Sequence, residues 1–480
     1  MLPVLTPAEM VEADRAAIAA GTSEATLIDR AGRALAVVAR RMLGGTYGRR
    51  VLVLAGPGNN GADGKVAAAT LERWGVRVAV VDVPLRIDRV VVDRELRRTG
   101  LVIDAMYGTG LRRALVDDAA WLVERLQNHR VLAADIPSGV DGSTGLVGSV
   151  AVRAERTCCF QALKHGHVFE PGRALAGDVE VVELGIPVSS SVHAVELADV
   201  VARPRGAGSH KWSRSVFVVG GSGGMTGAPI LAARAAQRSG AGMVVTGLSG
   251  VSAQRASGSE IVTRAYAADP DGSFAIEAAE RIVRDAARFG ATVVGPGLGR
   301  AIGSDAVAAR VVAEVPTPLV VDADALNVIA GDPAPLRIRH AAGLPMAILT
   351  PHAGEYERLA GRPVGGSRVE AARHLAGLLR AVVVLKGPGT VVAHPDGSVR
   401  VARGGGVELA TAGTGDVLAG IIAARLAAGD DPFSAGWSAA VVHADAGSRS
   451  SAGEGTVASD VVESLPVAWA AVGTARTIRS

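Results

Sequence analysis

Short apolar runs alternate with amphipathic segments along the first part of the chain. The runs at 51–54, 76–81, 101–103 and 131–134 predict buried strands. Four helices are predicted between and before these strands. The first starts at the capping box Thr6-Pro7-Ala8-Glu9, the second covers 23–43, the third ends near Gly75, and the fourth covers 117–128. Continuous apolar strands between helices indicate a parallel sheet with helices on both faces, which is the α/β class.

The alternation fades over 186–209 and then starts again. We expect a linker near 200–209, because this stretch is rich in Arg, Pro, Gly and Ser. Further strands are predicted at 216–219, 243–246, 293–294, 319–321, 347–349 and 382–385, with a hairpin turn at 394–398. Helices are predicted at 228–238, after Gly415 and at 432–447. The chain is therefore predicted to hold two doubly wound α/β domains, of which the second is larger.

Composition narrows the class of protein. A chain of 480 residues has room for two or three domains. The formal charge of +3, without a block of basic residues, argues against a nucleic-acid or membrane partner. There is no apolar run of about 18 residues and no signal-like start, so we expect a cytoplasmic protein. Cys158 and Cys159 are neighbours and give neither a disulfide framework nor a zinc site, so they are predicted to be core residues.

Lysine is scarce in this chain. Only four of its 50 basic side chains are lysines, namely Lys65, Lys164, Lys211 and Lys386. An ammonium group is a compact charge and a guanidinium a wide fork, so a lysine kept in an arginine-rich chain can mark a chemical need. The alternative for each of these lysines is that it was kept by chance and not for its chemistry.

Three polar, glycine-rich loops follow predicted strands of the first domain. They are GPGNNGADG at 56–64, DAMYGTGL at 104–111 and DIPSGVD at 135–141. Ligands of parallel α/β sheets bind at the carboxyl ends of the strands. The glycines allow backbone N–H groups to approach a phosphate at a helix N-terminus, and oxygen-only donors favour a hard cation.

Together with an F-x-x-x-K-x-G segment at 160–166, these loops resemble the epimerase domain of NAD(P)H-hydrate repair enzymes. The resemblance covers about residues 1–205 and implies a Rossmann-like sheet. It implies a K⁺ site formed by Asn60, Asp104 and Ser138, and Asp135 as the acid/base for R/S interconversion at the hydrated carbon, with Lys164 beside the reacting ring or the phosphates. The implied substrate-binding residues are Asn59, Asn60, Gly61, Ala62, Asp63, Gly108, Thr109, Gly110, Leu111, Arg112, Arg113, Ala114 and Asp135. Ala62 departs from the family, which usually has Gly there, and a positive φ would strain it.

The second domain carries its own set of motifs. They are GGSGGMTGAP at 220–229, GPGLG at 295–299, DADALN at 322–327, TPHAGE at 350–355, KGPGT at 386–390 and GTGD at 413–416. In GTGD, glycines open a helix whose N-terminus faces anions, and Asp416 is placed to take a proton from a substrate hydroxyl. Asp322 and Asp324 have a simpler alternative, which is to cap the helix that follows them.

These motifs resemble the ribokinase-like fold and, within it, the nucleotide-dependent NAD(P)H-hydrate dehydratase. The resemblance covers about residues 209–480, with Trp212 as a departure where the family usually has Gly. It implies substrate contacts from Ala228, Gly297, His352 and Asp416. It implies nucleotide contacts from Lys386, Gly387, Pro388, Gly389, Thr390 and Gly415. The implied chemistry is phosphorylation of the hydrate's hydroxyl with Asp416 as base, followed by loss of phosphate, with ADP as the phosphoryl donor and Mg²⁺ bridging its phosphates.

The leading hypothesis is thus one bifunctional enzyme that repairs NADH hydrate and NADPH hydrate, as an isomerase and a lyase, and assembles as a homo-oligomer. A hydroxymethylpyrimidine- or thiazole-type kinase is the alternative enzyme, since GTGD and KGPGT would serve it equally well. A nucleotide-binding sensor or scaffold is the alternative without catalysis, especially for the first domain.

Overall fold

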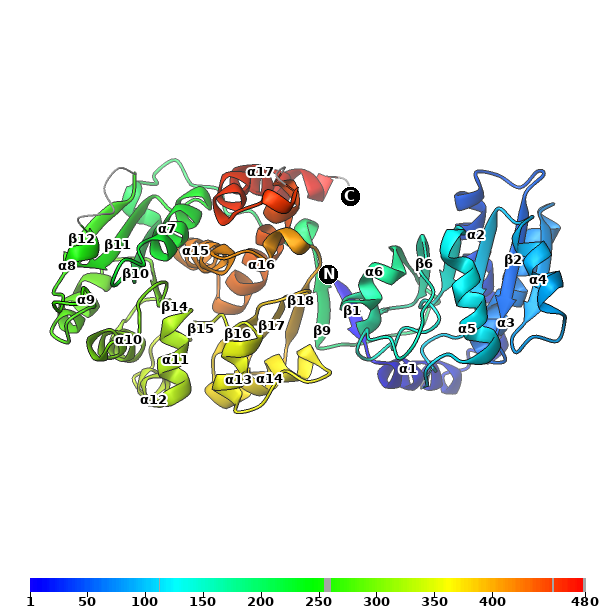
Figure 1. The fold of residues 1–480 in the computed structure, drawn as a ribbon, viewed down its shortest axis with the longest axis horizontal. Coiled ribbons are helices and arrows are strands. Elements are labelled where there is room, and N and C mark those ends of the chain that lie inside the picture. Colours follow the sequence, from blue (N-terminus) through cyan, green and yellow to red (C-terminus); the bar gives the residue numbers. More distant parts are fainter. Residues whose placement is uncertain (112, 254–259, 451–452, 478–480) are drawn as a thin grey trace. The chain divides into compact units, whose positions relative to one another are not determined.

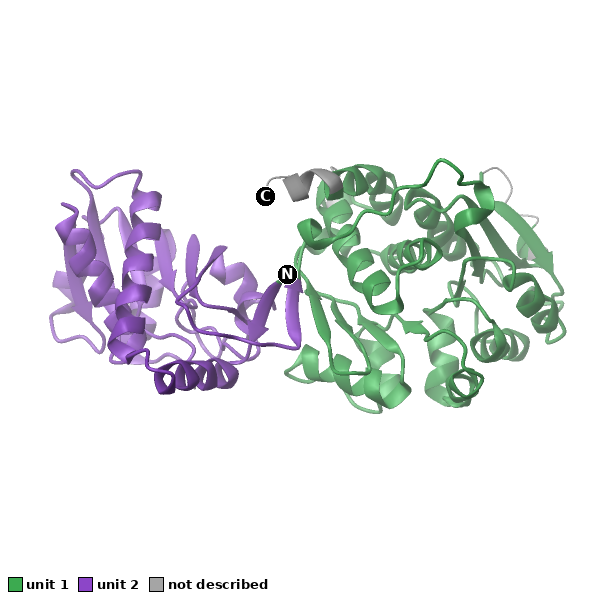
Figure 2. Cartoon of the chain, turned by 180° about the vertical axis from the view of Figure 1, so that it is seen from behind, with its two compact units in different colours: residues 1, 195–480 green, residues 2–194 purple. Residues whose placement is uncertain are grey.

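The chain forms two compact units (Figures 1 and 2). The computed structural model describes residues 1–111, 113–253, 260–450 and 453–477. One unit is Leu2–Ala194, purple in Figure 2, and the other is Met1 with Val195–Ser480, green in Figure 2. Residues 2–194 are called the first unit here, and residues 195–480 the second unit.

The first unit is built on a six-stranded parallel sheet with the order β3-β2-β4-β5-β6-β8. Its strands are β2 (Arg50–Ala55), β3 (Arg77–Asp82), β4 (Leu101–Ala105), β5 (Val131–Ala134), β6 (Arg156–Phe160) and β8 (Asp178–Val182). Val51 and Val53 of β2 lie in one apolar core, whereas Leu52 and Leu54 lie in another. Both faces of the sheet are therefore buried, which explains why its central strands are continuously apolar.

Helices cover both faces of this sheet (Figure 1). They are α1 (Pro7–Ala19), α2 (Glu24–Leu43), α3 (Asn59–Arg73), α4 (Arg89–Leu96), α5 (Asp117–Arg125) and α6 (Gly172–Ala176). Leu35 of α2 and Leu71 of α3 belong to one core, and Val92 of α4 and Leu122 of α5 to the other. The capping box predicted before α1 is confirmed, since Thr6 Oγ1 accepts from the Glu9 N–H and the Glu9 carboxylate accepts from the Thr6 N–H.

A small group of short strands fixes the start of the chain beside the sheet. β1 (Leu2–Leu5) pairs in parallel with β7 (Leu163–Lys164) and antiparallel with β9 (Val192–Val195). The pairing places Leu5 opposite Lys164. This register brings Lys164 close to the beginning of α1, which matters for the site described below.

The second unit has a longer sheet with the order β12-β11-β10-β13-β14-β15-β16-β17-β18. Its strands are β10 (Ser215–Val219), β11 (Met243–Ser249), β12 (Val262–Tyr266), β13 (Ala291–Val294), β14 (Leu319–Val321), β15 (Ile348–Leu349), β16 (Val382–Leu385), β17 (Val391–Ala393) and β18 (Val399–Ala402). β10 to β16 pair in parallel, and β17 and β18 continue antiparallel. The antiparallel pair confirms the turn predicted at 394–398.

Helices also flank this second sheet. They are α7 (Gly227–Arg238), α8 (Gly250–Ala253), α9 (Ala278–Ala286), α10 (Ile302–Glu314), α11 (Asp324–Gly331), α12 (Ala334–Ala341), α13 (Ala353–Ala360), α14 (Arg368–Leu379), α15 (Thr414–Ala427), α16 (Pro432–Arg449) and α17 (Ala458–Thr477). α15 is buried almost all round, in a core that it shares with α7, α16 and α17. Trp437 belongs to that core.

The predicted α/β class with two parallel sheets is confirmed. The sequence pattern did not identify β6, β8 and α4 in the first unit, because their side chains mix buried and exposed positions or are too few for a clear period. The stretch 200–209 has no helix or strand, but Arg203 pairs with Asp430 at 2.9 Å. Among the residues that the structure describes, no helix has the length and apolar character needed to cross a membrane.

Candidate active sites

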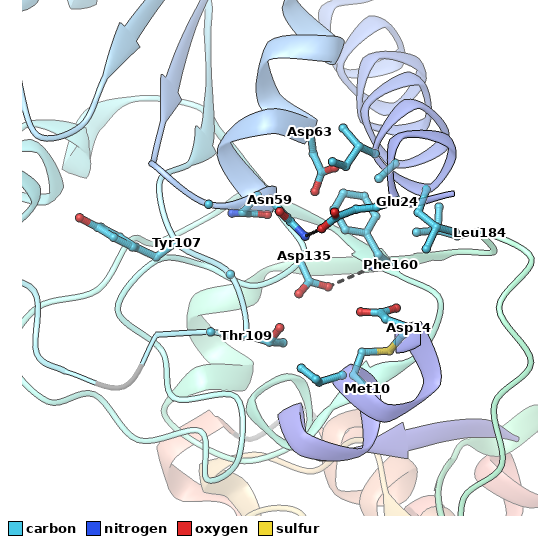
Figure 3. A pocket seen from close by; sticks show the side chains of 18 of the residues that line it. Met10, Asp14, Glu24, Asn59, Asp63, Tyr107, Thr109, Asp135, Phe160 and Leu184 are labelled. Carbon is cyan, nitrogen blue, oxygen red and sulfur yellow. Dashed lines mark hydrogen bonds between the residues drawn. The ribbon is translucent and has the colours of Figure 1, made fainter. Parts of the chain in front are cut away.

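The three polar loops of the first unit meet at one cavity of about 460 Å³ (Figure 3). They follow β2, β4 and β5, and the strand order reverses between β2 and β4, where ligands of such sheets bind. Apolar side chains of α1, α2 and the segment after β8 complete the wall. These are Met10, Val11, Ile18, Leu27, Ile28, Leu184 and Ile186.

A buried ion pair lies at this cavity. Lys164 Nζ lies 2.5 Å from Asp135 Oδ1, and Lys164 is 1% exposed. Burial alone would lower the pKa of Lys164, but the charge and hydrogen bond of Asp135 raise it above its ordinary value. Asp135 has φ +62, a conformation that costs a non-glycine residue energy and is often kept at functional sites. The Phe160 N–H also donates to Asp135 Oδ1, so two donors fix the position of this oxygen.

Two further carboxyl groups face the same cavity. Burial raises the pKa of Asp63 to about 8, and the charges of Asp135 and Asp14 add to the rise. Burial also raises the pKa of Asp14, while Lys164 lowers it. Asp63 was predicted, but Asp14 was missed. The sequence signal for Asp14 was its position between Met10 and Ile18 at four-residue spacing, which puts a carboxyl group in an otherwise apolar row of the helix.

The loop after β2 becomes the N-terminus of α3. Gly58 is its N-cap and offers no side chain, so the first N–H groups of α3 receive no side-chain cap. Asn59 Nδ2 donates to Glu24 Oε1 at 2.9 Å. Ala62 lies inside the helix with negative φ, so its departure from the family's Gly strains nothing. Gly61 has no room for a Cβ, which would lie 1.9 Å from the Gly56 carbonyl oxygen.

Two of the three predicted cation ligands, Asp104 and Ser138, contact each other directly. Asp104 is fully buried, and its carboxylate accepts from the Ser138 N–H at 2.8 Å and the Ser138 hydroxyl at 2.7 Å. Burial raises the pKa of Asp104 to about 6, although these hydrogen bonds act to lower it. Asn60 packs against Gly108, and both of its amide atoms are buried without a hydrogen-bond partner.

Only some of the residues predicted in the loop after β4 line the cavity. Gly108, Thr109, Gly110 and Leu111 line the cavity. Arg113 and Ala114 are exposed and lie outside its lining. Arg112 lies outside the described residues.

The second unit gathers its motifs at the carboxyl ends of its parallel strands. The GGSGG loop follows β10 and the GPGLG loop follows β13, the two strands between which the order reverses. The N–H groups of Gly221 and Ser222 donate to the Gly297 carbonyl at 2.9 and 2.8 Å. Gly297 has φ +58, and a Cβ there would lie 2.4 Å from the Met225 oxygen, so the close approach of the two loops requires glycine. Ala228 follows in the first turn of α7.

A charged network follows β14, β15 and β16. Lys386 Nζ lies 2.9 Å from Asp322 Oδ1 and 3.7 Å from Glu355 Oε2. The Thr350 hydroxyl donates to Asp322 Oδ1 at 2.6 Å. Burial alone would lower the pKa of Lys386, but these carboxylates raise it. Asp322 thus pairs with Lys386, and no side chain caps α11, so the capping alternative does not hold.

Asp416 stands in the first turn of α15, behind Gly413 with φ +92. Burial raises its pKa to about 7; the charge of Asp322 adds to the rise and that of Lys386 opposes it. A Cβ built on Gly415 would lie 3.2 Å from Lys386 Nζ. Lys386 and the start of α15 therefore pack closely, with the candidate base next to the candidate phosphate-binding lysine.

His352 is the N-cap of α13. Its Nδ1 accepts from the N–H groups of Gly354 and Glu355, and Glu355 Oε2 accepts from the His352 N–H at 2.7 Å. The His352 side chain is 56% exposed, and its Nε2 lies 3.6 Å from Glu355 Oε1. Asp324 accepts from the Gly299 N–H at 2.9 Å, which ties the loop after β14 to the one after β13.

The segment KGPGT follows β16. Gly387 and Gly389 both have positive φ, and Arg368 donates to the carbonyls of Leu385 and Lys386. Sequence reasoning did not single out Glu355 or Arg368. Glu355 stood inside a quoted motif, and Arg368 lies in a helix distant in sequence with no motif of its own.

Two family models match this chain. The model described as NAD(P)H-hydrate dehydratase matches residues 216–466. The model described as YjeF-related protein N-terminus matches residues 24–91 and 83–166. Together they cover most of both units.

Curated relatives match almost end to end. The bifunctional NAD(P)H-hydrate repair enzyme Nnr of Moorella thermoacetica is 33% identical, over 96% of this chain and 96% of its own. The enzyme of the same name from Salinibacter ruber is 36% identical, over 97% of this chain and 95% of its own. The Mycobacterium leprae enzyme is 36% identical, over 95% and 97%.

Among solved structures, the chain is similar to an ADP/ATP-dependent NAD(P)H-hydrate dehydratase from Bacillus subtilis. The identity is 28%, the TM-score is 0.46, and the match covers 57% of this chain and 96% of that one. On the identity and coverage of its curated relatives and on the dehydratase family model, the chain belongs to the family of bifunctional NAD(P)H-hydrate repair enzymes.

Proposed function

We propose that this chain repairs hydrated nicotinamide nucleotides in two steps. Residues 1–205 interconvert the R and S forms of the hydrate, and residues 209–480 dehydrate the S form with ADP. The observation that carries the proposal is that one chain holds two sites of acid–base character. Asp135 and Asp416, one in each unit, both stand beside a lysine that is mostly or fully shielded from solvent, at the carboxyl ends of parallel strands.

In the first unit, Asp135 is the acid/base at the hydrated carbon, and Lys164 orients it. Their pairing at 2.5 Å on the wall of a cavity supports these roles. The uncapped N–H groups at the start of α3 offer a place for the phosphates of the nucleotide. The substrate contacts proposed for residues 59–63 and 108–114 stay predictions.

We propose that Asn60, Asp104 and Ser138 hold K⁺. The residues fit such an ion, because Asn60 has an unpartnered buried amide oxygen and Asp104 a fully buried carboxylate. All three donors are oxygens, as a hard cation prefers. When bound, K⁺ supplies a fixed positive charge that neutralises Asp104 and orders the loops after β2 and β4.

In the second unit, Asp416 takes the proton from the hydroxyl of the hydrate as the terminal phosphoryl group of ADP moves to that oxygen, and AMP leaves. Phosphate then departs with the C–O bond electrons, pushed by the ring nitrogen, and a proton lost from the neighbouring carbon restores NADH or NADPH. Ala228, Gly297 and His352 contact the hydrate, while residues 386–390 and Gly415 hold the nucleotide. The position of Asp416 at a helix N-terminus beside Lys386 supports this assignment.

Mg²⁺ is proposed as the ion that accompanies the nucleotide. Mg²⁺ in such sites is held largely by phosphate oxygens and waters, with one or two carboxylates. The residues around Asp416 suit that arrangement, because Asp324 and Asp416 add carboxylates near the proposed phosphate position. When bound, the ion neutralises charge on the transferred phosphoryl group.

Separate substitutions Asp135→Asn and Asp416→Asn test the proposal. Asp135→Asn should stop epimerisation and leave dehydration of the S form intact, and Asp416→Asn should do the reverse. A sensor would keep its ligand affinity in both variants and show no turnover to lose. A small-molecule kinase would phosphorylate an alcohol other than the hydrate and would not regenerate reduced nicotinamide.

Two finer predictions accompany the proposal. The protein is predicted to assemble as a homo-oligomer, which size-exclusion chromatography with light scattering would test. It is predicted to work in the cytoplasm, where fractionation of the cells that make it would find it.

A further inference from the structure

We propose that Asp63 is the general acid of the epimerase and protonates the hydroxyl that leaves the hydrated ring, while the Asp135 carboxylate acts as the base. The inference rests on the proposed function of the first unit. It divides the acid–base work between two side chains.

Asp63 meets the geometric requirements of such an acid. It is 6% exposed, yet it lines the cavity, and Figure 3 shows its carboxyl directed into that space. In the part of the chain that the structure describes, its carboxyl makes no hydrogen bond and no ion pair. A buried carboxyl that is left unpaired beside an empty space is available to a ligand.

The two carboxyl groups have opposite surroundings. Asp135 Oδ1 accepts from Lys164 and from the Phe160 N–H. Within the described part of the chain, no donor reaches the Asp63 carboxyl. Burial raises the pKa of Asp63 to about 8, and the charges of Asp135 from the loop after β5 and Asp14 from α1 add to the rise, so Asp63 is largely protonated at pH 7. A carboxylate paired with a cation beside an unpaired, buried carboxyl suits a base and an acid in one site.

The charge of the cavity suits the intermediate that this step requires. Among the described residues that line it, four are acidic, namely Asp14, Glu24, Asp63 and Asp135, and only Lys164 is cationic. The acidic side chains of this site favour a ring that carries positive charge. The phosphates of the nucleotide would lie at the start of α3, where Gly58 and Asn59 line the same cavity and uncapped N–H groups offset the acidic charge.

In the proposed epimerisation, the hydroxyl of the hydrate is on the ring carbon next to the ring nitrogen. When the C–O bond breaks, its electron pair goes to the oxygen, which takes the proton of Asp63 and departs as water. The nitrogen lone pair forms a C=N bond, which gives a planar cation. Water then adds to the other face, its proton passes to Asp135, and the C=N electrons return to nitrogen. Transfer of a proton from Asp135 to Asp63 through water in the cavity restores the starting state.

The test compares full-length wild type with Asp63→Asn, using the R form of NADH hydrate and measuring formation of the S form above the spontaneous rate. The turnover number should fall by about 100-fold or more, as for loss of a general acid, with KM within about 3-fold. Dehydration of the S form by the second unit should be unchanged, which shows that the variant is folded. Glu72→Gln, an exposed carboxyl-to-amide change on the same helix, should match wild type.

The pH profile and an isotope give independent readouts. Wild-type epimerisation should decline above about pH 8, where Asp63 ionises, and the residual activity of Asp63→Asn should lack that decline. In water enriched in ¹⁸O, each epimerisation should bring in one ¹⁸O atom. Asp63→Asn activity within about 3-fold of wild type, an unchanged alkaline decline, or epimerisation without ¹⁸O would overturn the inference. Absence of epimerisation in the wild type would instead refute the proposed function.

Discussion

The Nζ atom of Lys164 lies 2.5 Å from Oδ1 of Asp135, and the lysine is 1% exposed. These residues are 29 positions apart: Asp135 follows β5, and Lys164 is the last residue of β7. The pairing of β1 with β7 places Lys164, and the left-handed turn at Asp135 directs the carboxylate toward it. The proposed role of the first unit depends on this pair, in which Lys164 orients the carboxylate of Asp135.

Replacing Lys164 with Met should destabilise the first unit and stop epimerisation. The variant leaves the Asp135 carboxylate buried without its cation, which costs about 3 kcal/mol or more of unfolding free energy. Urea unfolding of the full chain, followed by a probe in the first unit, measures this. Lys65→Met is the matched control, because Lys65 and Asp82 form an exposed pair that should contribute less than about 1 kcal/mol. Equal effects of the two substitutions would contradict a structural and catalytic role for the buried pair.

The dehydratase rate should depend on the ionisation of Asp416. Burial raises the pKa of this carboxyl to about 7, and a base must be unprotonated to accept a proton. Activity on the S hydrate with ADP should therefore fall as the pH drops below about 7 and level off above it. Asp416→Asn should lose about 100-fold or more of the turnover number and keep epimerase activity. A rate that is flat between about pH 5.5 and about pH 8 would argue against Asp416 as the base.

Gly415→Ala should impair the second unit alone. The added Cβ would lie 3.2 Å from Lys386 Nζ and would press the ammonium away from the start of α15. Steady-state kinetics should show a loss of about 10-fold or more in turnover of the S hydrate, which corresponds to about 1.4 kcal/mol of transition-state stabilisation. Gly377→Ala is the control, because a Cβ at that helical position meets nothing within 4 Å. If Gly415→Ala turned over the S hydrate with the nucleotide as fast as wild type, the turnover would not depend on the position of Lys386.

K⁺ should raise the melting temperature of the first unit. An ion that binds only the folded state stabilises it in proportion to the logarithm of its concentration. Calorimetry in KCl against an organic-cation chloride of equal ionic strength measures the effect, and Asn60→Ala should remove most of it. The effect should weaken below about pH 6, because Asp104 is then protonated. A K⁺ effect of equal size in Asn60→Ala would place the ion elsewhere.

Much of the fold was predictable because apolar strands and capping signals are local. The pattern at Thr6–Glu9 predicts the first helix, and the glycine-rich loops mark the carboxyl ends of the central strands. β6 was missed because its sequence RTCCF gives only a short apolar run, although four of its five side chains are buried, and β8 because Asp178 and Glu180 interrupt its valines.

The candidate sites were predictable where a motif carried the residue. Asp135, Lys164 and Asp416 all stand in quoted motifs. Of the partners that tune them, Asp14 stands in no quoted motif. Asp322 and Lys386 each stand in one, but the motifs do not report that these side chains, 64 positions apart, pair with each other. Pairing of this kind depends on tertiary packing, and no local signal in one sequence reports it.

The most direct test of the account is recovery of reduced nicotinamide from an R/S mixture of NADH hydrate. The purified chain is mixed with the hydrate, Mg²⁺, K⁺ and ADP, and the return of reduced-nicotinamide absorbance is followed. The account predicts full recovery, because the first unit converts R to S as the second consumes S. Recovery that stops once the S form is exhausted, at a rate of R conversion no faster than the spontaneous one, would contradict it.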